Sequence, residues 1–257
     1  MKEDQPRPDT ASVAILVKAA PQVSTKYGET VCCAGIDAYG DWVRLYPVAF
    51  RSLESSQKFG RWSIVEYPWQ APRTDKRMES RRIDQSQLKV TGELKRGHRE
   101  SYLSRAIVDG VKGVQENGGS LALLRPEISA FEIQKRSKSE LDEQTDKFAN
   151  SVKQVDMFFK TPAKPFVPCP YKFLYRYRSA DGDRLGTCQD WEMEGTFYKW
   201  RSLYGEQSAL DKMSDRFGSE YLDGSTFFAM GTHSRWPETW LINGVVRIPQ
   251  TGQTSLL

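Results

Sequence analysis

The sequence predicts an α+β protein that begins with a small antiparallel β-sheet or barrel of the OB or PUA-like kind. A helical, basic middle and a C-terminal α+β segment are expected to follow. Short apolar runs separated by turn residues predict the β module, and apolar residues at helical spacing predict helices after it. Four prolines within residues 160–170 predict a boundary before the last segment.

Four apolar runs predict the strands of the first module. They are rich in β-branched and aromatic residues, and they cover residues 13–18, 30–36, 41–48 and 61–69. An Asp-x-x-Gly turn between the second and third runs is typical of a hairpin. We expect residues 72–100, which are basic and lack apolar periodicity, to form a long connection on the surface.

The remaining elements follow from periodicity. Apolar residues at helical spacing predict a helix over 103–114, closed by Asn117-Gly118-Gly119. Strands are expected at 121–125, 130–134 and 171–178, the last of these ending in a hairpin turn, and helices at 138–153, 189–205 and 206–218. Two apolar strands around residues 231–237 complete the prediction. The chain is thus divided into a loose tail (1–12), an antiparallel β module (13–70), a basic connection with helices and two strands (71–160) and an α+β segment (161–257).

Composition excludes several classes of protein. The hydrophobic fraction is 39%, the mean hydropathy is −0.60, and no apolar run approaches the length of a membrane-spanning helix. The N-terminus lacks the apolar core of a signal peptide. We therefore expect a cytoplasmic protein with no membrane partner.

Charge is distributed unevenly along the chain. The net charge is +4, and residues 73–112 hold 11 Lys and Arg against 6 Asp and Glu. Residues 160–204 hold 8 against 5. Clustered cations of this kind are typical of a protein that binds a phosphate backbone, although ordinary solvated surface has the same appearance.

Cysteine and histidine are too sparse for a familiar metal centre. The chain has four cysteines without a Cys-x-x-Cys pair, and only two histidines. Structural zinc sites usually need four such ligands at close spacing. We expect free thiols, no metal and no cofactor.

Three groups of residues are candidates for contacts with nucleic acid. On the predicted strand 171–178, Lys172, Arg176 and Arg178 alternate with four aromatic rings, and we favour the interpretation that the rings form the core face and the cations a charged strip. Trp42 and Arg44 share a strand face with Tyr46, which is either a stacking surface or a covered sheet face. Arg77, Arg81 and Arg82 lie in the basic connection, as phosphate ligands or as solvated loop residues.

Four residues are weaker candidates for catalysis. Asp190, Glu192 and Glu194 could hold a divalent cation, although Asp190 is placed as a helix N-cap, and capping is the interpretation we favour. His233 lies in a polar turn between two apolar strands, where it is either an acid–base group or a plain loop residue.

These observations favour a nucleic-acid-binding protein that uses phosphate contacts and aromatic stacking. No catalytic motif is present, so we leave open whether the chain is an enzyme. A metal- or histidine-assisted enzyme acting on nucleic acid or nucleotides is the alternative, and a protein-interaction scaffold with a protein partner is the second. An accessory subunit of a bacterial defence or mobile-element system is one setting for the preferred function.

Overall fold

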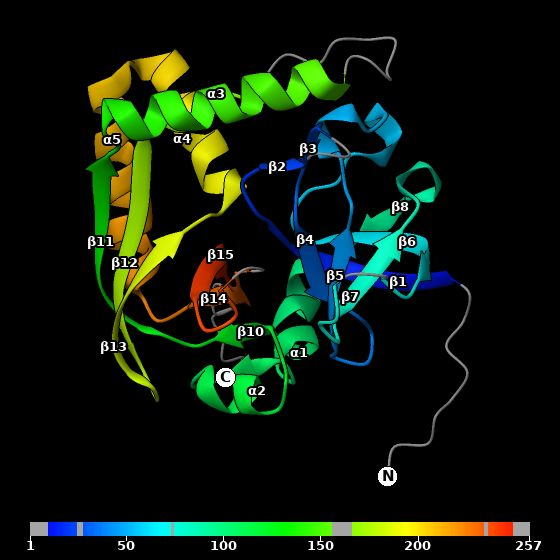
Figure 1. The fold of residues 1–257 in the computed structure, drawn as a ribbon. Coiled ribbons are helices and arrows are strands. Elements are labelled where there is room, and N and C mark those ends of the chain that lie inside the picture. The colour runs from blue at the N-terminus through cyan, green and yellow to red at the C-terminus, as the bar shows by residue number, and fades with distance from the viewer. Residues whose placement is uncertain (1–9, 25–27, 73–74, 156–165, 234–235, 249–257) are drawn as a thin grey trace.

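A closed β-barrel forms the N-terminal part of the molecule, and a second, larger sheet with helices forms the rest (Figure 1). The computed structural model describes residues 10–24, 28–72, 75–155, 166–233 and 236–248. The mixed α+β class with an N-terminal barrel is therefore confirmed. Residues 10–12 of the predicted tail belong to the first strand, and residues 1–9 lie outside the described residues.

Five strands close the barrel. They are β1 (Thr10–Lys18), β4 (Cys33–Ile36), β5 (Trp42–Tyr46), β6 (Ser63–Gln70) and β7 (Ser80–Ile83). Their order is β1-β4-β5-β7-β6, and β6 pairs with β1 to complete the circle. All neighbours are antiparallel except β5 and β7, which are parallel. A sixth strand, β8 (Lys89–Glu93), adds to β6, and a small hairpin of β2 (Gln22–Ser24) and β3 (Gly28–Thr30) lies between β1 and β4.

Alternating side chains explain why these runs form a barrel. Val13 and Ile15 of β1 point into the barrel with Val43, Leu45 and Val65, and all five are at most 4% exposed. The strands approach closely at Gly35, where an added Cβ would lie 2.1 Å from the carbonyl oxygen of Ala14. A side chain at Gly35 would therefore separate β1 from β4.

The expected surface connection at residues 72–100 instead supplies two strands. β7 closes the barrel, and β8 extends its sheet. The prediction missed them because Ser80–Ile83 places two arginines between one serine and one isoleucine, and only Ser80 and Ile83 are buried. Pairing with β5 and β6 defines this strand, and β5 lies more than 30 residues before it.

Seven strands form the second sheet, in the order β11-β12-β13-β15-β14-β10-β9. They are β9 (Ile107–Val108), β10 (Leu121–Leu124), β11 (Glu127–Lys135), β12 (Tyr171–Ser179), β13 (Gly182–Cys188), β14 (Thr226–Thr232) and β15 (Trp240–Arg247). The helices are α1 (Arg99–Leu103), α2 (Lys112–Glu116), α3 (Lys138–Val155), α4 (Trp191–Tyr204) and α5 (Glu206–Met213). The helix predicted over 103–114 is wrong, because Ile107 and Val108 pair with β10 as a strand between α1 and α2.

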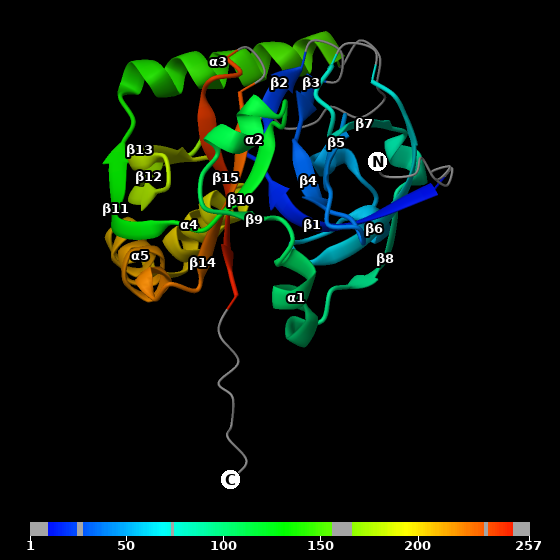
Figure 2. The same ribbon diagram turned by 90° about the horizontal axis from the view of Figure 1, so that it is seen from below.

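The centre of the second sheet is buried on both faces. Leu121 and Leu123 of β10 pack with Ala14 and Leu16 of the barrel, whereas Leu124 packs on the opposite face. That opposite face is covered by α4 and α5, so β10, β14 and β15 lie between the barrel and these two helices (Figure 2). Burial on both faces explains why the sequence of β10 is continuously apolar.

Helix α3 runs across the top of the molecule in Figure 1 and connects its two parts. Its Glu140 pairs with Lys172 of β12, and the helix also contacts the β2–β3 hairpin. No helix in the described part of the chain is long and apolar enough to cross a bilayer.

Candidate nucleic-acid interface

Trp42 and Arg44 lie on the outer face of the barrel, but the second sheet covers that face. Arg44 is only 2% exposed, and Trp42 packs against the apolar cluster between barrel and sheet. The Arg44 guanidinium donates to the Ser120 hydroxyl at 3.0 Å and to the Ser120 carbonyl at 3.3 Å. Arg44 therefore holds the two parts of the molecule together and offers no donor to solvent.

Glu79 completes this buried contact. Its carboxylate accepts hydrogen bonds from the Ser120 amide at 2.6 Å and from the Ser120 hydroxyl at 2.8 Å, and it is 7% exposed. The Glu79 carbonyl in turn accepts from the Arg44 amide at 2.8 Å. A buried cation needs compensation of this kind.

The outer face of β5 becomes accessible only at its end. Tyr46 is 42% exposed, and its register partner on β7 is Arg82. Paired residues on neighbouring strands point to the same side of a sheet, so the Tyr46 and Arg82 side chains leave the sheet on the same side. Among the described residues, Arg82 has no hydrogen-bond or ion-pair partner.

The loop between β6 and β7 borders this exposed end. Arg77 donates two hydrogen bonds to Asp75, at 2.8 and 2.6 Å, and reaches the Thr232 carbonyl at 3.4 Å. Burial raises the pKa of Asp75, but hydrogen bonds from Arg77 and Ser80 outweigh it and lower that pKa to about 2. Arg77 is therefore engaged by a carboxylate that stays ionised.

Arg81 and Met78 also flank the exposed end. The Arg81 guanidinium lies over the Trp69 ring, 4.6 Å from its centroid, and donates to the Met78 carbonyl at 2.7 Å. The Met78 side chain is 62% exposed. Of the three predicted cations Arg77, Arg81 and Arg82, only Arg82 has a guanidinium without a hydrogen-bond or ion-pair partner in the described structure. The exposed Lys76 ammonium also has no such partner among the described residues.

The charged strip on β12 forms elsewhere, on the outer face of β11–β13. The aromatic rings of β12 point into the core, which is the interpretation favoured from the sequence. Each of Tyr171, Phe173, Tyr175 and Tyr177 is at most 7% exposed. The cations point the other way, and each meets a carboxylate. Arg178 donates to Asp183 at 2.7 and 3.2 Å, Arg176 to Glu132, and Lys172 to Glu140.

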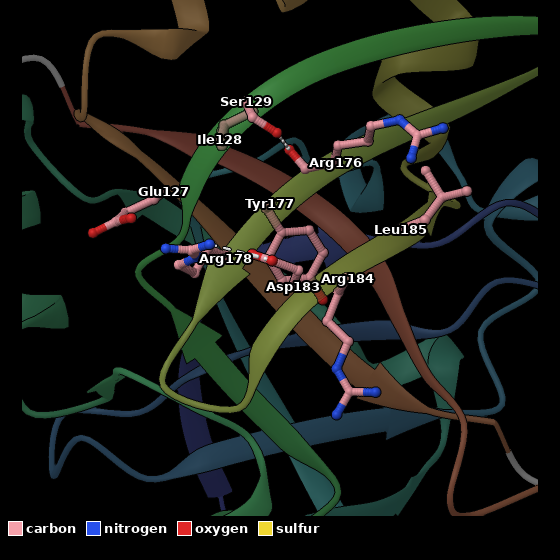
Figure 3. A pocket seen from close by; sticks show the side chains of 9 residues that line it. All are labelled: Glu127, Ile128, Ser129, Arg176, Tyr177, Arg178, Asp183, Arg184 and Leu185. Atoms are coloured by element: carbon pink, nitrogen blue, oxygen red, sulfur yellow. Dashed lines mark hydrogen bonds and ion pairs between the residues drawn. The ribbon is translucent and has the colours of Figure 1, made fainter.

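An open hollow of about 720 Å³ lies over this strip (Figure 3). Arg184 and Glu127 lie at its border with no partner among the described residues, and Leu185 is 50% exposed. The side chains of Arg176, Arg184 and Glu127 point away from one another in Figure 3. Three arginines and two carboxylates line the hollow, so positive and negative groups are interspersed and the excess of cations that attracts a phosphate backbone is small.

The three candidate carboxylates do not converge on one point. Asp190 caps α4 by accepting from the Glu192 amide at 2.9 Å, and it also accepts from Arg61 at 2.6 Å and from the Val245 amide at 2.8 Å. Glu192 pairs with Lys18 at 3.1 Å. Burial raises the pKa of Glu192, but Arg61 and Lys18 outweigh it, so the pKa lies below its ordinary value.

Glu194 lies apart from this network. It is 6% exposed, and its Oε2 has no hydrogen-bond partner in the described structure. Burial raises the pKa of Glu194 from its ordinary value of 4.5 to about 7. No group of three His, Cys, Asp or Glu side chains in the described ranges is arranged to hold a metal ion.

His233 follows β14 directly. Its amide donates to the Thr239 carbonyl at 3.0 Å, and its carbonyl accepts from the Trp236 amide at 3.2 Å. These bonds define a tight turn after Thr232, the residue whose carbonyl Arg77 contacts. Ser234 and Arg235 of the predicted turn lie outside the described residues.

The sequence did not reveal that Tyr46 and Arg82 are register partners, because β7 was expected to be a loop. It also gave no signal for Arg61, the buried cation that engages Asp190 and Glu192. Arg61 follows a glycine in a short polar segment, and its partners lie far along the chain.

Comparison with solved structures gives a match to a replication protein A heterotrimer bound to single-stranded DNA. The sequence identity is 11%, the match covers 93% of this chain and 64% of that chain, and the TM-score is 0.25. This chain thus spans less than two thirds of the length of that structure. A TM-score this low carries no argument about fold or function. No curated protein matches the sequence.

Two family models match consecutive parts of the chain. A domain of unknown function, DUF8758, matches residues 9–109, which include the whole barrel. A second, DUF8757, matches residues 105–257, which include the second sheet and most of the helices. The two matches overlap over residues 105–109, which follow α1 and include β9. Because the second model covers more than half of the sequence, the chain belongs to the DUF8757 family.

Proposed function

We propose that the protein binds single-stranded nucleic acid at the exposed end of the barrel, through phosphate contacts and aromatic stacking around Tyr46 and Arg82. The barrel is proposed to be of the OB type. Numbered along the chain, its strands follow the order 1-2-3-5-4 and close from the fourth to the first, with the third and fifth parallel. Such barrels bind oligonucleotides on the face of strands two and three and with the adjoining loops.

The position of Tyr46 and Arg82 supports this proposal. Tyr46 ends the third barrel strand, and Arg82 lies beside it on the fifth. The loop between the fourth and fifth strands carries the exposed cation Lys76 and the engaged cation Arg77. The part of the outer face that holds Trp42 and Arg44 is covered by the second sheet, so we expect the contact to be short.

The observation that carries the proposal is the pairing of an exposed ring with an unoccupied guanidinium. Tyr46 is 42% exposed, and the Arg82 guanidinium forms no hydrogen bond or ion pair in the described structure. A ring stacks on a base of any sequence, and a guanidinium pairs with a phosphate through two parallel hydrogen bonds. The pair therefore suits binding without strong sequence preference, and we expect affinity for single strands to exceed that for duplexes.

Fluorescence anisotropy with the full chain tests the proposal. Labelled single- and double-stranded DNA and RNA are titrated at two salt concentrations. Loss of one stacked base costs about 1–3 kcal/mol, so Tyr46→Ala is expected to weaken binding roughly 5- to 150-fold. Arg82→Ala is expected to remove about one phosphate contact. The slope of log K against log salt should then become shallower by about 1.

Two matched variants serve as controls. Tyr204→Ala with Lys199→Ala removes one exposed ring and one exposed cation from α4, on the far side of the second sheet. Arg176→Ala with Arg178→Ala removes the charged strip of β12. Neither double variant should change the affinity. Salt-insensitive binding, or equal losses in the Tyr46 and Tyr204 variants, would contradict the proposal.

The enzyme hypothesis finds no comparable support. Asp190 and Glu192 are engaged by Arg61 and Lys18, and Glu194 is buried apart from them. Intact probes after incubation with Mg²⁺ are therefore the expected result in the same titrations. The scaffold hypothesis stays a prediction.

A further inference from the structure

A second hollow lies at the other end of β5, next to the turn that joins β4 to β5. Its volume is about 370 Å³. It is lined by Ala38, Gly40, Leu94, His98, Ser101, Tyr102 and Arg105. Pockets for small ligands begin at roughly 300 Å³, so the hollow can take a small molecule or the end of a chain.

Four polar lining residues come from one short stretch of chain, formed by a 3-10 turn, α1 and the turn that follows α1. His98 ends a 3-10 turn at Arg96–His98, and α1 follows directly. Counting from His98, Ser101, Tyr102 and Arg105 stand three, four and seven positions further along the chain, which is the spacing of one helix face. The segment therefore presents an imidazole, a hydroxyl, a phenol ring and a guanidinium to the same space.

Arg105 is held in place by its stem, while its guanidinium remains free. An added Cβ at Gly40 would lie 3.2 Å from Cβ of Arg105 and 3.5 Å from its Cδ, so the aliphatic part lies along the turn. Gly40 has φ +87°, in the left-handed region that favours glycine. In the described structure the guanidinium has no hydrogen-bond or ion-pair partner.

The other groups around the hollow have defined partners. The Tyr102 hydroxyl donates to the Ile36 carbonyl at 3.0 Å, which fixes its ring as one wall. The Ser101 hydroxyl lies 3.1 Å from the His98 carbonyl. Leu94 is buried and forms the apolar floor.

The lining of the hollow contains the Arg105 cation and no carboxylate, whereas the charges around it are mixed and include the exposed acids Asp41 and Glu100. Lys95 and Arg96 are exposed next to His98, and neither has a partner within the described ranges. Arg99 is engaged by Glu93 and lies over the Trp62 ring. The nearest acid on the facing turn is Asp37, whose Oδ1 already accepts from the amides of Tyr39 and Asp41.

We infer that this hollow binds a phosphate monoester. Such a group carries nearly two negative charges and three strong acceptor oxygens, which match the free Arg105 guanidinium and the His98 ring. The Ser101 hydroxyl can donate to it only after turning away from the His98 carbonyl. The half-buried ring of Tyr102 and the Leu94 floor then contact the attached sugar or base. The ligand is either a free mononucleotide or the terminal phosphate of a polynucleotide. The inference does not rest on the surface at Tyr46 and Arg82, which lies at the opposite end of β5.

Calorimetric titration of the full chain with adenosine monophosphate tests this inference, and adenosine is the control that lacks the phosphate. The monophosphate is expected to bind and adenosine to bind far more weakly. Arg105→Gln should weaken the binding of the monophosphate about tenfold or more, because a charge-assisted pair is lost. Lys199→Gln, the matched removal of one exposed cation from α4, should leave it unchanged.

A second titration distinguishes the two sources of phosphate. Labelled single strands with a 5′-phosphate or a 5′-hydroxyl are compared, and a preference for the phosphate that Arg105→Gln abolishes identifies the chain end as a ligand. Binding of the mononucleotide without that preference identifies the free nucleotide. His98→Gln with Ser101→Ala repeats the test at two exposed positions, and circular dichroism checks that each variant folds. Failure of every phosphorylated probe to bind, or equal affinity in wild type and the Arg105 variant, overturns the inference.

Discussion

At the scale of single residues, the most unusual group is Glu194. Its carboxyl is buried on α4, and the attraction of Arg136 does not offset the cost of burying the charge. Its Oε2 accepts no hydrogen bond in the described structure. Burial raises its pKa to about 7, so the folded protein holds a proton on Glu194 at pH values where the unfolded chain has lost it. Folding stability therefore depends on pH through this one residue.

The sign of this dependence follows from proton linkage. The stability that protonated Glu194 contributes is fully present below its unfolded pKa of about 4.5, and it is lost as the pH rises to about 7. At about 1.4 kcal/mol per pKa unit, the loss is about 3 kcal/mol. Glu194→Gln, which cannot ionise, is expected to remove this decline.

Urea denaturation at pH 5 and pH 8 measures the effect. From pH 5 to pH 8, the free energy of unfolding of wild type should fall relative to that of Glu194→Gln by about 3 kcal/mol. Glu116→Gln, an exposed residue of α2, should show the wild-type profile. Parallel profiles for wild type and Glu194→Gln would exclude a buried, protonated Glu194.

At the scale of elements, the start of α4 is fixed by Asp190. Its carboxylate is 3% exposed and accepts from the Glu192 amide, the Arg61 guanidinium and the Val245 amide. One side chain thus joins α4, β15 and the start of β6. Because Arg61 is itself buried, loss of the carboxylate leaves a cation with only the more distant Glu192.

Asp190→Ala is expected to destabilise the protein by about 3–5 kcal/mol, the usual cost of breaking a buried ion pair by removing one partner. The double variant Asp190→Ala with Arg61→Met should cost less than the single variant, because it removes the uncompensated charge as well. Chemical denaturation of both variants measures this. Asp211→Ala, on the exposed side of α5, is the control and should change stability little.

The elements that the sequence predicted are those with strong local patterns. β1, β5, β6 and β10 have continuous or alternating apolar residues, and α3 and α4 were expected within a few positions of their observed ends. β7 was missed because its short polar sequence becomes a strand only through pairing with β5 and β6. The burial of Arg44 was equally hidden, since Ser120, which engages it, lies 76 residues away.

At the scale of the whole molecule, the barrel and the second sheet share one apolar interface. Ala14, Leu16 and Ile36 of the barrel pack with Leu123 and Phe227 of the sheet, and all are nearly or fully buried. The Arg44–Ser120–Glu79 contact lies at the edge of this interface. The two family models therefore correspond to parts that bury a common core.

We expect the two parts to unfold together. Tryptophan fluorescence and far-ultraviolet circular dichroism should report the same urea midpoint for the full chain, as for a single cooperative unit. Leu123→Ala, which leaves a cavity in the interface, should lower the free energy of unfolding by about 2–5 kcal/mol and shift the urea midpoint equally for both probes. Separate transitions for the barrel and the sheet would show that the interface contributes little.

The order of strands along the chain has a consequence for synthesis on the ribosome. All barrel strands leave the ribosome before α1. Strand β10, however, pairs with β14, so Leu124 cannot pair until Phe228 has been synthesised. At bacterial or eukaryotic rates of elongation this delay is on the order of 10 s. During that time the apolar outer face of the barrel, including Leu16 and Ile36, lacks the part of its cover that β14 and β15 provide. The nascent chain is therefore a client for chaperones that bind exposed apolar surface, and slower growth at low temperature should raise the yield of folded protein.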